Sequence, residues 1–245
     1  MSPRDALTVR PVRFTHDVPR WQTVLTAMGA VLLDEQPGRL VYQLAAGRLA
    51  LHAASESRPA GTTTLALETT VPLAEAVAAA AAEGVAIELG HGEHGPTGLV
   101  RATDGTVLTL DPATPNPRRL VAGEPCVSVM PVWSTPDARV AVDVLDGLGL
   151  RRRVTQEDGS WADLTARRGG LHGVHPLGEV GAGLAFELEG DVATLHRALT
   201  AAGVPAELDD GGPARTLRFA DPDGGAPLPV AERQPDLYGY ALSEM

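Results

Sequence analysis

LTAMGA at residues 25–30 returns as LDGLGL at residues 145–150, and this repeat decides the fold of the chain. The two copies place Gly29 and Gly149 at a distance of 120 residues. Two further pairs recur in the same order at distances of 120 and 119 residues: Leu51-His52 with Leu171-His172, and Asp104-Gly105 with Asp223-Gly224. Landmarks at a nearly constant distance indicate a duplicated unit of about half the chain.

Each half divides once more into two similar units. Gly29, Gly84, Gly149 and Gly203 each follow a stretch with a helical pattern, and glycine is the residue that most often ends a helix. The expected helices span residues 18–28, 73–83, 137–147 and 192–202. A β-rich stretch precedes each helix, and three short ones separated by turn residues follow it. We therefore predict an α+β fold of four strand–helix–strand–strand–strand (βαβββ) units.

The composition excludes several classes of function. A formal net charge of −11 argues against a nucleic-acid-binding protein, because such a protein needs a basic surface. All 20 basic side chains are arginine, so Schiff-base and P-loop chemistry, which use lysine, are excluded. Cys126 is the only cysteine and can form no intrachain disulfide. No stretch resembles a signal peptide or a membrane span, so we expect a cytoplasmic protein without a membrane partner.

The repeat and the proline content together suggest domain boundaries. We expect a first domain at residues 1–115, a proline-rich linker at 116–125 and a second domain at 126–235, followed by a polar tail at 236–245. Clustered prolines disfavour both helix and sheet, which suits a semi-rigid spacer.

The order of the units, the AEGV and AAGV segments that close helices (82–85 and 201–204) and the DPDG turn (221–224) resemble the vicinal oxygen chelate superfamily. That superfamily includes glyoxalase I, extradiol dioxygenases and drug-resistance proteins such as the bleomycin-binding ones. The resemblance covers nearly the whole chain. It implies that units pair so that their sheets form an open cup with helices on the convex side. Four units would make two tandem glyoxalase-like cup domains.

The resemblance also implies where a metal would bind, because enzymes of the superfamily hold a divalent ion on the first and last strands of the units. The last-strand positions correspond to His52, Thr109, His172 and Leu228. The first-strand positions correspond to Val9 or Arg10, Thr63 or Thr64, Val129 or Met130, and Gly183 or Leu184. Each half offers one plausible ligand, a histidine, where a catalytic site needs three or more. The resemblance thus implies a member without a metal, and we expect no cofactor.

Seven residues are candidates for contacting a ligand. His52 and His172 occupy the same place in the repeat, and each is either a polar group facing a cup or a hydrogen-bonded histidine at a strand end. Trp161 and Asp163 share one face of a strand by the period of two, which would give a stacking platform and a hydrogen-bond acceptor. The remaining candidates are Trp133 as a second wall, Tyr42 in the comparable hairpin of the first half, and Arg10 on its first strand.

Two other groups of histidines are interpreted as structural. His175 lies three residues after His172, which places it on the opposite face of an extended strand. His91, Glu93 and His94 in GHGEHG could surround a metal, but the glycines indicate an exposed hairpin connection.

These observations favour a metal-independent protein that binds a small organic molecule. The drug-sequestering members of the superfamily are the nearest model, and the second half, with its tryptophans, is the expected binding half. The alternative is a metal-dependent lyase, isomerase or dioxygenase of the same superfamily. The chain is expected to be a monomer or a homodimer.

Overall fold

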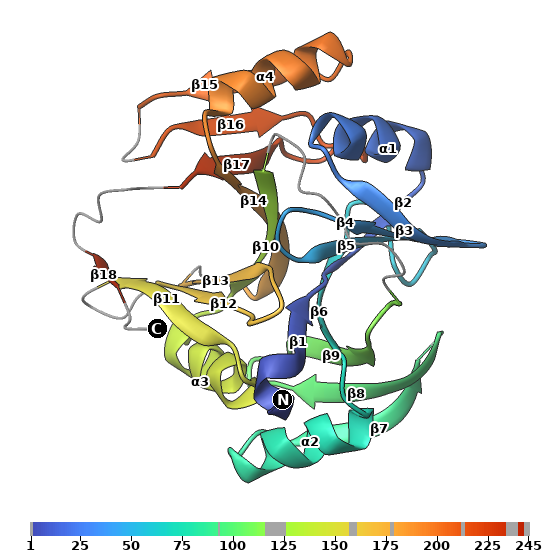
Figure 1. Cartoon of the computed structure of the whole chain (residues 1–245), viewed down its shortest axis with the longest axis vertical. Helices are drawn as coiled ribbons and strands as arrows, with labels where there is room; N and C mark the ends of the chain where they lie inside the picture. Colours follow the sequence, from blue (N-terminus) through green and yellow to red (C-terminus); the bar gives the residue numbers. More distant parts are fainter. Residues whose placement is uncertain are drawn as a thin grey trace.

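The computed structural model describes residues 2–92, 94–115, 126–156, 161–176, 179–211, 214–233 and 240–242. It contains four βαβββ units in tandem, with the four helices on the outside of the molecule (Figure 1). The predicted α+β fold of two tandem glyoxalase-like cup domains is confirmed. The expected linker at residues 116–125 lies outside the described residues.

The first two units contain η1 (Pro3–Ala6), β1 (Leu7–Val9), β2 (Val12–Thr15), α1 (Val18–Ala27), β3 (Val31–Gln36), β4 (Arg39–Gln43), β5 (Arg48–Ala53), β6 (Thr63–Thr69), α2 (Leu73–Ala82), β7 (Ile87–Gly92), β8 (Gly95–Arg101) and β9 (Val107–Pro112). The last two contain β10 (Cys126–Ser134), α3 (Ala138–Leu148), β11 (Arg151–Gln156), β12 (Ala162–Thr165), β13 (Leu171–His175), β14 (Gly181–Glu189), α4 (Val192–Ala201), β15 (Ala206–Asp209), β16 (Thr216–Phe219), β17 (Leu228–Glu232) and β18 (Tyr240–Leu242).

Helices α1 and α3 show how the repeat encodes the fold. Asp17 and Asp137 each cap a helix, accepting a hydrogen bond from the backbone three residues later. Gly29 and Gly149 follow the ends of these helices with φ of 73° and 118°, a conformation that side chains disfavour. The first helix thus begins and ends as the sequence predicts.

Each half of the chain forms one mixed sheet. The first has the strand order β3-β4-β5-β2-β6-β9-β8-β7, with β1 added against β6, and the second has the order β15-β16-β17-β14-β10-β13-β12-β11-β18. In both sheets, two units join through their antiparallel first strands, β2 with β6 and β10 with β14. We call the sheet side away from the helices the cup face, and the two concavities the first cup and the second cup.

Two local features depart from the expected pattern. The β-rich stretch before the first helix is broken into β1 and β2 at Arg10-Pro11, because proline has no N–H to donate to a ladder. The chain end also contributes to a sheet, since β18 pairs with β11. Part of the expected tail at residues 236–245 is therefore a ladder strand.

The two domains interlock through the repeated Asp-Gly turns. Asp223 accepts hydrogen bonds from the Thr15 hydroxyl at 2.6 Å and the Trp21 indole at 3.0 Å, both in the first domain. Asp104 accepts bonds from the Thr135 hydroxyl and, at 2.9 Å, the Trp133 indole, both in the second. Helix α1 accordingly packs near α4, and α2 near α3 (Figure 1).

This interlock corrects the expected role of Trp133. The side chain belongs to the hydrophobic core and is 1% exposed. Because alternate residues of a strand face opposite sides, Trp133 on β10 points away from the second cup, whose face carries Met130 and Val132. Trp133 is a domain contact and not a cup wall.

Among the described residues, no helix is both long enough and apolar enough to cross a membrane.

Candidate functional site

The first cup encloses a cavity of about 510 Å³. Its apolar floor comes from Val12 and Phe14 of β2, which form with Val41, Ala50 and Ala66 a small cluster apart from the main core. Polar groups from β4, β5, β8, β9 and the turns after β5 and β7 surround this floor. An apolar floor with a few convergent polar groups is typical of a small-molecule site.

His52 stands in the wall of this cavity, on the cup face of β5. It pairs in register with Phe14 of β2, and the two rings meet edge to face at 5.7 Å. Its Nε2 is buried and has no hydrogen-bond partner within the described structure. Burial, together with repulsion from His94, Arg10 and Arg39, lowers the pKa of His52 to about 3. The imidazole is therefore neutral near pH 7 and presents an unused polar atom.

Arg10 lies at one end of the cavity in a buried ion network. Its Nε lies 2.8 Å from Glu68 Oε1, without hydrogen-bond alignment, and its guanidinium donates to Asp111. Glu68 also accepts from Arg48 and, at 2.7 Å, from the Thr114 hydroxyl. With every carboxylate matched by a guanidinium, this end of the first cup is built to stay charged and rigid.

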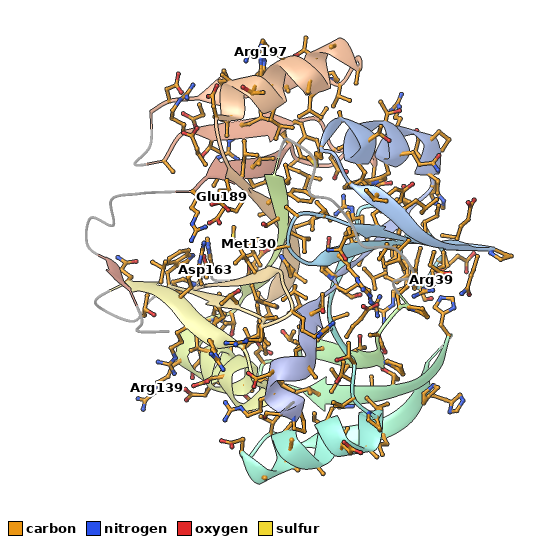
Figure 2. The ribbon with its side chains drawn as sticks, viewed as in Figure 1. Arg39, Met130, Arg139, Asp163, Glu189 and Arg197 are labelled. Atoms are coloured by element: carbon orange, nitrogen blue, oxygen red, sulfur yellow. The ribbon has the colours of Figure 1, made fainter. Side chains whose placement is uncertain are left out.

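The rim of the first cup carries further cations. Arg39 of β4, labelled in Figure 2, donates to Asp34 at 2.6 Å and to Thr114 at 3.2 Å. Arg58 follows β5 in a tight turn, and its guanidinium lies 5.7 Å from the centroid of the Phe14 ring. Both residues line the cavity.

His91 and His94 also line this cavity, although the sequence pattern indicated only an exposed connection. Both are exposed, and the ring of His94 meets that of His52 edge to face at 4.8 Å. Glu93 lies outside the described residues. The hairpin between β7 and β8 therefore reaches the first cup beside β5. The sequence did not predict this contact, because the two segments are far apart in the chain.

The second cup is occupied by an ion triad. Arg153 of β11 donates to both Asp163 of β12 and Glu187 of β14. The side chain of Asp163, labelled in Figure 2, is 2% exposed, and its Oδ1 has no partner within the described structure. Burial raises the pKa of Asp163 to about 6, against the lowering effect of Arg153. Asp163 faces the second cup as the alternation predicted, with its charge largely neutralised by Arg153.

Trp161 and His175 are the other polar pair of the second cup. The Trp161 indole donates a hydrogen bond to His175 Nε2, and the rings meet at 70°. Because of this hydrogen bond, the indole N–H already has a partner inside the protein. Trp161 and Asp163 are two residues apart, and the alternation of a strand would place them on the same face.

His172 does not face the second cup, which corrects the sequence prediction. It is 0% exposed, pairs in register with the core residue Leu164, and donates a hydrogen bond from Nδ1 to the Gly173 carbonyl oxygen. Burial lowers its pKa to about 4. His172 is a core histidine of β13.

The register explains the error. Between the second and third strands, the third unit has four residues in sequence (157–160) where the first unit has two (37–38). Between the third and fourth strands, it has five (166–170) where the first unit has four (44–47). The distance between equivalent residues therefore grows from 120 to 123 before the last strand. His52 is equivalent to His175, while His172 is equivalent to Leu49. An odd change in numbering moves a strand residue to the other face.

Tyr42 is a second correction. It is 4% exposed and belongs to the helix-side core, where burial raises the pKa of its hydroxyl, against the lowering effect of a hydrogen bond with Gln22. Its neighbour Gln43 takes the opposite face of β4. Tyr42 cannot contact a ligand in the first cup.

Glu68 and Glu187 are site residues that the sequence analysis missed. They are equivalent, each on the cup face of the first strand of its unit and each paired with arginine; Glu68 is buried and Glu187 is half-buried. The signal was present in the repeat: Ala66-Leu67-Glu68 and Ala185-Phe186-Glu187 recur at a distance of 119 residues.

The donor set does not fit the divalent metal of the superfamily. The cup-facing positions of the first and last strands that are not held in ion pairs include Val12, His52, Thr64 and Thr109 in the first cup, and Val132, Gly183, His175 and Pro229 in the second, whereas the carboxylates Glu68, Asp111 and Glu187 pair with arginine. Each set supplies one nitrogen. Within the described ranges, no three histidine, cysteine, aspartate or glutamate residues are grouped so that they could hold an ion.

Comparisons with known proteins give matches in structure only. No protein-family model matches the chain, and no curated protein does. Homoprotocatechuate 2,3-dioxygenase from Arthrobacter globiformis is similar with a TM-score of 0.63 and 17% identity, over 95% of this chain and 82% of the other. The Brevibacterium fuscum dioxygenase in complex with 3,4-dihydroxyphenylacetate has a TM-score of 0.63 and 16% identity, over 94% and 82%.

A Mn(II)-bound glyoxalase from Novosphingobium aromaticivorans is similar with a TM-score of 0.60 and 15% identity, over 93% of this chain and 82% of the other. The prediction of a protein without a cofactor is contradicted by this finding, because a protein of the same fold carries a metal. The chain has the fold of the vicinal oxygen chelate superfamily, in the two-domain form that its repeat and its resemblance predicted.

Proposed function

We propose that the chain binds a small organic molecule in its first cup. The observation that carries the proposal is the cavity of about 510 Å³, which has an apolar floor and the unused Nε2 of His52 in its wall. Its volume lies within the range of roughly 300–1,000 Å³ that is typical of small-molecule sites. The similar dioxygenase that binds 3,4-dihydroxyphenylacetate makes aromatic molecules of that size the first class to try.

The second cup is the weaker site, contrary to the sequence-based preference. Its polar groups bond to one another, through Arg153 with Asp163 and Glu187 and through Trp161 with His175. A ligand would have to replace these contacts before it gained its own. In the first cup, Nε2 of His52 has no internal hydrogen bond that a ligand would have to replace.

The test is a thermal-shift screen followed by calorimetry of the probes that raise the melting temperature. The panel contains 3,4-dihydroxyphenylacetate, catechol, phenylacetate and antibiotics, because the superfamily includes drug-binding members. A probe that binds only the native state raises its stability. We expect His52→Ala to lower the affinity of a bound probe about tenfold, the cost of one buried hydrogen bond.

His175→Ala is the matched control, because His175 occupies the equivalent place in the second cup. We expect it to leave the affinity unchanged. A probe whose binding depends on His175 and not on His52 would place the site in the second cup and overturn the proposal.

The second candidate is a metal-dependent enzyme of the superfamily, such as a lyase, isomerase or dioxygenase. The observation that favours it is the pair of His52 and His94, whose rings lie 4.8 Å apart beside the cavity. A neutral imidazole is the form that ligates a metal. The grouped donors remain fewer than a catalytic ion requires.

Metal analysis of the purified protein separates the two candidates. Near-stoichiometric Mn, Fe, Zn or Ni in the wild type, lost in His52→Ala and retained in His175→Ala, would establish the second candidate. Probe binding that is unchanged after exhaustive chelation supports the first.

A further inference from the structure

The charges around the first cup are unequal. Among the described residues, the charged groups that line the cavity and the ion pairs connected to them comprise four guanidiniums and three carboxylates: those of Arg10, Arg39, Arg48 and Arg58, and those of Asp34, Glu68 and Asp111. The excess is local, because the whole chain carries a formal net charge of −11. A positively charged cleft attracts a negatively charged ligand, even when the protein as a whole is negatively charged.

The excess resides in one residue. Arg10 and Arg48 share Glu68, and Arg39 pairs with Asp34. Arg58 has no ion pair with a carboxylate in the described part of the chain. Glu56 in the same turn is exposed, does not line the cavity and forms no ion pair with it there.

Arg58 is positioned for recognition. Its backbone is held in the turn by mutual hydrogen bonds with Ser55, of 2.9 and 3.2 Å. Its guanidinium lies over the Phe14 ring, 5.7 Å from the centroid, at the edge of the apolar floor. Stacking on an aromatic face leaves the edge of a guanidinium free, and that edge matches a carboxylate. The hydroxyls of Ser55 and Ser57 line the same rim and add donors there.

We propose that the first cup selects molecules with an apolar body and a carboxylate, and that Arg58 binds the carboxylate at the rim. The proposal rests on the proposed function, since it names the ligand class of that same site. The body lies on Val12 and Phe14 beside the neutral imidazole of His52, and the charged end meets Arg58. Arg10, by contrast, is already paired with the carboxylates of Glu68 and Asp111.

The test uses matched pairs of acids and amides that differ in charge and hardly in shape: phenylacetate with phenylacetamide, benzoate with benzamide, and butyrate with butyramide. Affinities are measured by calorimetry with the full chain. We expect at least one acid to bind about tenfold or more tightly than its amide, which is the effect of a charged hydrogen bond. Arg58→Ala should abolish that difference while retaining the affinity for the amide, and Arg58→Lys should restore it in part.

Arg139→Ala is the control, because Arg139 is an exposed arginine of α3 far from the first cup (Figure 2). It should bind every probe as the wild type does. Acids and amides that bind equally to the wild type, or a preference for acids that survives in Arg58→Ala, would overturn the inference. If the amides bind in a His52-dependent manner without any preference for acids, the proposed function stands and the inference falls. If neither these acids and amides nor the wider panel of probes binds, both fall.

Discussion

In the first cup, two arginines share Glu68, and an open cavity remains beside them. In the second cup the arrangement is reversed: Glu187, the equivalent of Glu68, and Asp163 share a single arginine. The scaffolds agree strand by strand. The residues on the cup faces do not: where the first cup has Arg10 and Asp111, the second has Met130 and Ala231.

The difference shows that the two cups can carry different side chains at equivalent positions of the same duplicated fold. His52 and His175 stand at equivalent places, yet one imidazole is unpartnered at Nε2 and the other accepts a hydrogen bond from Trp161. The residue equivalent to Trp161 in the first cup is Arg39, which pairs in register with His52. One exchange in the neighbouring strand is enough to change a histidine from a free wall group to an internally bonded one.

The largest expected effect concerns the two glutamates. Glu68→Ala removes the partner of two buried guanidiniums and should lower the free energy of unfolding by about 3–5 kcal/mol. Glu187→Ala should cost only about 1–3 kcal/mol, because Arg153 keeps Asp163. Urea unfolding measures both. Equal losses would mean that the two ion networks stabilise their cups equally. Glu189→Ala, an exposed neighbour seen in Figure 2, is the control.

The second prediction uses the pKa of Asp163, which burial raises from 3.8 to about 6. The folded chain holds this proton more tightly than the unfolded chain, so its contribution to stability is complete below about pH 4 and is lost as the pH rises through about 6. The shift corresponds to at most about 3 kcal/mol. Relative to Asp163→Asn, the wild type should therefore be more stable at pH 4.5 than at pH 7.5 by about 2 kcal/mol, because part of the effect appears only below pH 4.5.

Urea unfolding at both pH values measures this dependence. Asp143→Asn on the exposed face of α3 serves as the control, because the side chain is 60% exposed. A stability difference between wild type and Asp163→Asn that does not change with pH would contradict the assignment of a raised pKa.

The third prediction compares the contacts that join the domains. Asp223→Ala removes bonds from Arg13, Thr15 and Trp21 at a side chain that is 1% exposed, and should cost about 2 kcal/mol. Asp104→Ala, the equivalent change, should cost about 1 kcal/mol because Asp104 is only half-buried. Thermal unfolding followed by tryptophan fluorescence measures both changes. A larger loss of stability for Asp104→Ala than for Asp223→Ala would contradict the prediction that the buried contact stabilises the protein more.

The smallest effect separates the two tryptophans that the sequence suggested as cup walls. Trp161→Phe removes an indole N–H that bonds a neutral histidine and should cost about 0.5–1 kcal/mol. Trp133→Phe removes a donor to the Asp104 carboxylate from a side chain that is 1% exposed, so it should cost about 1.5 kcal/mol. Urea unfolding of the two variants checks this order, and a larger loss for Trp161→Phe would reverse it.

The periodicity and the glycines were sufficient to predict the four βαβββ units, because helix caps and turns are local features of the chain. Gly29 and Gly149 end their helices as expected. The positions of His172 and Tyr42 were not predictable in this way. Two connections in the third unit are longer than those of the first, and the sequence alone does not show where the added residues fall.

The sequence by itself determined a duplicated α+β chain with two equivalent sheets, an acidic surface and no lysine, since these follow from local pattern and composition. Only the tertiary structure decided that His52, His94, Arg39 and Arg58 meet around one cavity, and that Asp104 and Asp223 join the domains. The physical reason is register: the face of a strand residue depends on how neighbouring strands align, and that alignment is set by pairing across the whole sheet.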